Sequence, residues 1–145
     1  MSTATATFPR MAPHELSMAR LHLMRAGYAL MAVGLALVKW PLLPGAHSMA
    51  LYEGVTLILL TAMSLMAVLG LRYPVQMLPL LLLEAVWKLL WLSLVALPQA
   101  INGNLSTEMT ETALNCSLVV LIIGVIPWRY VWTHYVRASG DPWRS

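Results

Sequence analysis

Charge is the scarcest property of this 145-residue chain. Charged residues make up only 10% of it and hydrophobic residues 59%, whereas a soluble domain carries about 25% charged residues. So few polar groups cannot cover a surface that faces water, and we therefore expect lipid to surround much of the chain. This composition excludes a disordered chain, a disulfide scaffold and an ordinary soluble enzyme.

Residues suited to catalysis and metal binding are also sparse. The single cysteine, Cys116, excludes an internal disulfide. The chain has no CxxC or HExxH motif, no phosphate-binding glycine loop and no Ser/His/Asp set. We therefore expect no cofactor and no metal, and we favour a protein that is not an enzyme. The net charge of +3 does not indicate nucleic acid, because the arginines are spread over both ends and one turn, where anionic lipid is the nearest partner.

Three long stretches of the sequence carry no charge at all. They are residues 54–71, 89–107 and 112–128, which contain 18, 19 and 17 residues. A helix needs about 20 mostly apolar residues to cross the hydrocarbon core of a bilayer. Each stretch, with its immediate neighbours, is therefore long enough for one membrane-spanning helix.

Prolines and glycines separate these stretches from one another and from a further apolar segment near the start of the chain. The pattern predicts an all-α transmembrane bundle of four helices in a single domain. The spans are predicted at residues 21–40, 49–71, 75–97 and 110–127. The first span is the weakest, because its uncharged part, residues 26–38, has a length that also suits a signal peptide. We favour a retained helix and keep a cleaved signal peptide as the alternative.

Two prolines bear on the third span. Pro98 is expected to end it, and Pro79 is expected to kink it by removing one backbone hydrogen bond. A break near a binding site, as in transporters, is the alternative interpretation of Pro79. The segment Asn102-Gly103-Asn104 then predicts a polar turn before the fourth span.

The two ends of the chain are expected to lie at the membrane surface. Residues 1–12 are predicted to be disordered, and residues 13–20 to form an amphipathic lead-in to the first span. Residues 128–145 contain several tryptophans and tyrosines, which concentrate at the level of the lipid headgroups. They predict an interfacial tail after the fourth span.

The basic residues predict the orientation of the spans. Lys39 lies at one side of the four spans, whereas seven arginines lie at the other: Arg10, Arg20, Arg25, Arg72, Arg129, Arg137 and Arg144. Because cytoplasmic loops carry the excess of basic residues, we expect both ends of the chain in the cytoplasm. The predicted location is the plasma or inner membrane, with the chain as a multi-pass protein.

Two opposite charges near the middle of the third span are the strongest candidates for a site. Glu84 and Lys88 are four residues apart, so their side chains lie on one face of a helix in the favourable order. Trp87 and Trp91 extend the same face. A charge at the centre of a bilayer costs about 2.5–3.5 kcal/mol. The pair therefore predicts either a polar pocket inside the bundle or a neutralised pair that holds helices in register.

Three further polar residues fall at a similar depth in the predicted bundle. Lys39 ends the first span, Glu53 begins the second, and Asn115 lies near the start of the fourth. Together with Glu84 and Lys88 they would form a pocket open to the outside. The alternative is that Lys39 and Glu53 extend to water independently.

The sequence leaves three functions open. The first is binding or carrying of a small molecule or lipid at Glu84 and Lys88. The second is a non-enzymatic accessory or scaffold subunit, in which the same pair docks the chain to a partner membrane protein or to a second copy. A lipid-modifying enzyme comes third, because a lone carboxylate lacks a visible catalytic partner.

Overall fold

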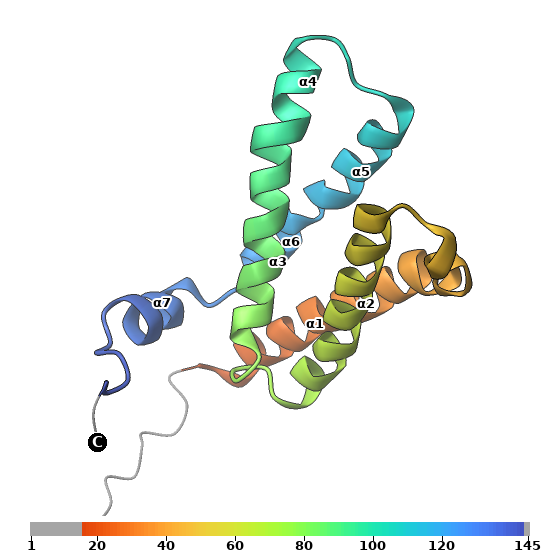
Figure 1. Cartoon of the computed structure of the whole chain (residues 1–145). Helices are drawn as coiled ribbons and strands as arrows, with labels where there is room; N and C mark the ends of the chain where they lie inside the picture. Colours follow the sequence, from red (N-terminus) through yellow and green to blue (C-terminus); the bar gives the residue numbers. More distant parts are fainter. Residues whose placement is uncertain (1–15, 144–145) are drawn as a thin grey trace, which may run out of the picture.

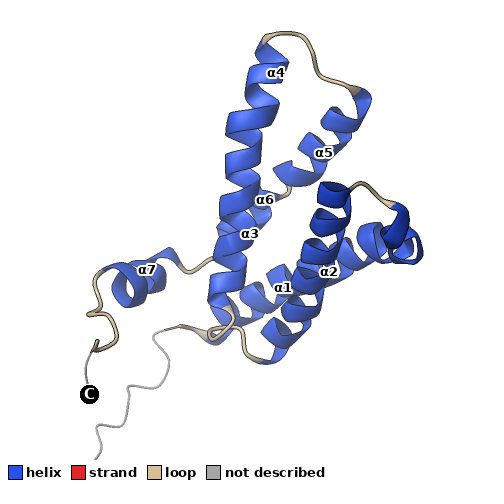
Figure 2. Cartoon of the chain, in the orientation of Figure 1, coloured by secondary structure: helices blue, strands red, loops and turns tan. Residues whose placement is uncertain are grey.

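The computed structural model describes residues 16–143, and within that range every regular element is a helix (Figure 2). Four helical segments are long and apolar enough to cross a membrane: Met18–Ser48, Leu51–Arg72, Leu78–Ile101 and Thr107–Val125. The prediction of an all-α chain with four long apolar helices is confirmed for these residues. The predicted disordered segment, residues 1–12, and the first part of the lead-in lie outside the described residues.

The first apolar segment consists of α1 (Met18–Lys39) and a 3₁₀ helix (Trp40–Ser48). Ser17 caps the start of α1, because its hydroxyl accepts a hydrogen bond from the backbone N–H of Arg20 at 3.2 Å. Two prolines in the 3₁₀ segment cannot donate backbone hydrogen bonds, and the chain leaves the α-helical path there. The helix therefore tightens before the chain reverses into α2 (Leu51–Arg72).

α1 and α2 form the most extensive helix pair of the structure (Figure 1). The buried Ser64 hydroxyl donates a hydrogen bond to the carbonyl of Ala32 at 2.9 Å and so joins the two helices. Gly70 lets them approach closely, because a Cβ at this position would overlap the ring of Tyr28. Gly27 does the same between α1 and α6 (Val119–Val125), where an added Cβ would lie 2.7 Å from a methyl group of Val125.

The third apolar segment begins and ends later than predicted. It consists of α3 (Leu78–Trp91), a π-helical turn (Leu92–Ala96) and α4 (Leu97–Ile101). The predicted kink at Pro79 is wrong, because Pro79 lies in the first turn of α3, where backbone N–H groups have no helical partner. The segment thus runs without a proline break from its first turn to the site residues.

The prediction that Pro98 ends this segment is also wrong. The helix continues to Ile101, and the wider π-helical turn ends at Ala96, two residues before the proline. In that turn the N–H of Leu97 bonds to the carbonyl of Leu92, five residues earlier. A proline removes the bond to the fourth carbonyl before it and crowds that carbonyl, and a π turn is a local change that relieves such crowding.

The predicted polar turn is confirmed, and it leads into the fourth apolar segment. Gly103 has φ +70°, a conformation that favours glycine. α5 (Thr107–Ser117) begins at Ser106, whose hydroxyl accepts a hydrogen bond from the N–H of Met109. A single tight turn at Leu118 separates α5 from α6. After α6 the chain forms the short helix α7 (Trp128–Val131) and a π-helical turn, Trp132–Val136.

The core lies mainly between α1, α2, α3 and α6, whereas α4 and α5 extend away from the α1–α2 pair (Figure 1). At the end where α1 begins, three side chains bind carbonyls at helix ends or turns. Arg20 donates to Ile126 at 2.5 Å, Arg25 to Leu71 at 3.1 Å, and the Tyr28 hydroxyl to Pro74 at 2.7 Å. Because helix ends leave carbonyls without helical partners, these contacts close this end of the bundle.

Candidate functional site

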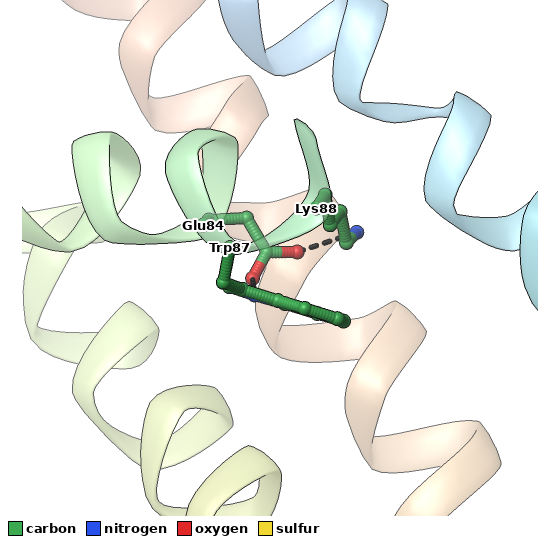
Figure 3. Close-up of polar contacts among 3 residues, drawn as sticks. All are labelled: Glu84, Trp87 and Lys88. Carbon is green, nitrogen blue, oxygen red and sulfur yellow. Dashed lines mark hydrogen bonds and ion pairs between the residues drawn. The ribbon is translucent and has the colours of Figure 1, made fainter. Parts of the chain in front are cut away.

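Glu84 and Lys88 form an ion pair on α3, which we call the charge pair. Lys88 Nζ lies 2.5 Å from Glu84 Oε1. The second carboxylate oxygen, Oε2, accepts a hydrogen bond from the indole N–H of Trp87 at 2.9 Å. Figure 3 shows the carboxylate between the amine and the indole ring. Both oxygens of Glu84 are therefore bound by side chains of its own helix.

The two members of the charge pair differ in exposure. The Glu84 side chain is 1% exposed, whereas that of Lys88 is 12% exposed. Leu81 and Ala85, on either side of Glu84 in sequence, belong to the buried core. Local helix geometry explains the pairing, since residues four apart lie on one face. The packing of α3 against its neighbours explains why the carboxylate is the more deeply buried partner.

The amine of Lys88 retains hydrogen-bonding capacity. An ammonium group has three N–H donors and no acceptor, and one donor serves Glu84. The Trp87 ring lies 5.7 Å from Nζ, close enough for a cation–π contact. Within residues 16–143 the amine makes no further hydrogen bond. The site thus combines zero net charge with two unused donors at its more exposed side.

Cys116 of α5 is a buried free thiol to which the sequence interpretation assigned no place near the charge pair. Its helix contacts α3, which carries the charge pair. A weak signal was present, because Cys116 directly follows Asn115, which the sequence had singled out.

The remaining predicted residues occupy different environments. Trp91 is half-buried on α3, and Lys39 is half-buried at the end of α1. Glu53 is exposed in the first turn of α2, and Asn115 is exposed on α5. Within the described part of the chain, no hydrogen bond or ion pair joins these four residues to the charge pair. The five-residue outer pocket stays a prediction.

Two surface grooves of the structure lie away from the charge pair. One apolar groove of about 620 Å³ runs along α2 and the 3₁₀ segment, and a second of about 480 Å³ lies where the chain leaves α6. Neither groove is lined by the charge pair. Among residues 16–143 no group of three His, Cys, Asp or Glu side chains could hold a metal ion. The charge pair is thus a small polar site set in apolar packing.

Comparison with known proteins found no match to this chain among protein-family models, curated proteins or solved structures.

Proposed function

We propose that the chain is a multi-pass integral membrane protein that binds a small molecule or lipid at the charge pair. Support for a membrane location comes from the four apolar helices. In the most apolar 18-residue stretch of each helix, only 17–33% is buried within the chain. In water such exposed apolar area would drive aggregation, whereas lipid solvates it. The proposed membrane is the plasma or inner membrane, with both ends of the chain in the cytoplasm.

The observation that carries the binding proposal is the asymmetry of the charge pair. Glu84 is saturated and buried, but Lys88 is partly exposed and keeps two N–H donors. An unsatisfied donor in an apolar environment costs free energy. A ligand acceptor that reaches Lys88 from the α5 side would recover this energy.

The chemistry of the pair indicates the class of ligand. Because Glu84 and Lys88 sum to zero, an added ionic group would bring an uncompensated charge into an apolar region, which is costly. A neutral acceptor such as a carbonyl, ester or hydroxyl avoids this cost. We therefore propose an amphipathic neutral ligand, with its polar group at Lys88 and its apolar body among the surrounding leucines and tryptophans.

A second candidate function has one observation in its favour. The segment Thr107–Val125 is only 17% buried, the lowest value of the four apolar segments. An accessory subunit that packs this segment against a partner membrane protein, or against a second copy, would bury the exposed face. In this case the charge pair would be structural.

Photolabelling tests the binding proposal. The full chain in a mild detergent is incubated with a photoactivatable diacylglycerol analogue, which is neutral and presents ester carbonyls. We expect labelling of α3 or α5 to fall at least about tenfold in Glu84→Gln/Lys88→Met, because the loss of a charge-assisted hydrogen bond is worth about 1.5–3 kcal/mol.

Arg72→Met is the matched control, because Arg72 lies in the last turn of α2, outside the predicted pocket, and belongs to no ion pair among the described residues. It should leave the labelling unchanged. Equal labelling of the double variant and the wild type would contradict the binding proposal. If a second membrane protein co-purifies with the wild type but not with the double variant, the accessory subunit would be favoured instead.

A further inference from the structure

The groove beside α7 has the composition of an anion site. It has a volume of about 480 Å³ and lies between the start of α1 and the segment that follows α6. Its lining includes Arg20 and Arg129 together with Trp128, Tyr130 and Thr133, and among residues 16–143 no acidic side chain lines it. Two arginines and two aromatic residues thus line one hollow at the end of the bundle that carries most of the basic residues.

The walls of this groove are fixed by hydrogen bonds. Arg20 of α1 donates to the carbonyl of Ile126, which joins the start of α1 to the end of α6. The Trp128 indole N–H donates to the carbonyl of Ile123 at 2.9 Å, and the Thr133 hydroxyl donates to the carbonyl of Arg129. The Trp128 indole and the Arg20 side chain are therefore held at the end of α6.

The groove offers donors that the protein itself does not use. A guanidinium has five N–H donors in a planar fork, and Arg20 uses one of its five for Ile126. The Arg129 guanidinium makes no hydrogen bond or ion pair within residues 16–143. A guanidinium fork can bind phosphate oxygens in a bidentate manner. A monoanionic phosphodiester offers such oxygens, and its negative charge is attracted to the two arginines.

We propose that this groove binds the phosphate of an anionic phospholipid headgroup. The aromatic wall favours a lipid over free phosphate, because Trp128 is 48% exposed beside the arginines and tryptophan prefers the headgroup level of a bilayer. Basic pockets beside membrane helices recognise such headgroups. The inference requires the membrane location proposed above, but it is independent of ligand binding at the charge pair.

Thermal unfolding of the full chain in a mild detergent tests the site. Short-chain dioctanoyl phosphatidylglycerol, dioctanoyl phosphatidylcholine and inorganic phosphate are titrated separately. We expect only the phosphatidylglycerol to raise the unfolding midpoint, because a ligand that binds the folded state stabilises it. Arg129→Gln should raise the concentration needed for half of this shift about tenfold, because it removes a charge-assisted bidentate contact.

Arg137→Gln is the matched control, since Arg137 is an exposed arginine of the same tail that does not line the groove. It should change the required concentration less than twofold. An equal loss in Arg137→Gln would overturn the site and indicate diffuse attraction. An equal shift with phosphatidylcholine would overturn recognition of the anionic group, and an equal shift with inorganic phosphate would overturn a lipid as the ligand.

Discussion

Single substitutions in the charge pair should cost different amounts of folding free energy. Lys88→Met leaves the carboxylate of Glu84, 1% exposed, without its counter-charge. Removing one member of a buried ion pair costs about 3–5 kcal/mol, and we expect this variant to lie in that range. Glu84→Gln should cost less, about 1–3 kcal/mol, because the lysine that remains is 12% exposed and can reach water or lipid carbonyls.

The double variant Glu84→Gln/Lys88→Met should recover most of this loss. Replacing both members of a buried pair by uncharged groups is often close to neutral. The amide oxygen of the introduced glutamine can still accept the N–H of Trp87, which in the wild type binds Glu84 Oε2. The double variant should therefore be more stable than Lys88→Met alone. The double variant would then lose far less free energy of unfolding than the sum of the losses in the two single variants.

Equilibrium unfolding of the wild type and the three variants in one detergent measures these differences as a double-mutant cycle. Circular dichroism first establishes that each variant keeps its helices. Additive losses, or single variants as stable as the wild type, would refute the reasoning, because they would mean that the two charges reach water independently. A double variant that folds but no longer binds ligand would identify the pair as a working site.

Two further predictions address packing and topology. Gly70→Ala should destabilise the fold by about 1–3 kcal/mol, because its Cβ would overlap a buried ring; Gly34→Ala, with nothing within 4 Å of the added Cβ, should be neutral or slightly stabilising in the same unfolding assay. Reporter enzymes fused after Ser145 should report the cytoplasm, whereas a reporter in residues 102–108 should report the outside. A cytoplasmic 102–108 loop would reverse the proposed orientation.

The local features of this protein were predictable from sequence. Three of the four apolar helices follow from charge-free stretches of suitable length, and the turn at Gly103 follows from its Asn-Gly-Asn context. The pairing of Glu84 with Lys88 follows from their spacing of four. Each of these features depends on residues that are close together in the chain.

The tertiary structure decided which faces of the helices pack. A helix that is apolar all round gives little indication of its buried face, since lipid and core both accept apolar side chains. The sequence therefore could not show that Cys116 is buried, or that Lys88 is the more exposed partner of the charge pair. It also could not show that Arg20 binds the carbonyl of Ile126.

The two prolines of the third apolar segment also show what the sequence determined and what only the structure decided. From sequence, Pro79 and Pro98 predicted a kink and a helix end, because proline lacks an N–H donor and crowds a carbonyl. In the structure, the helix starts late enough to place Pro79 in its first turn, and a π-helical turn lets the chain continue past Pro98. The sequence determined that the backbone must adjust at each proline. Only the folded structure showed where the helix begins and which adjustment the backbone makes.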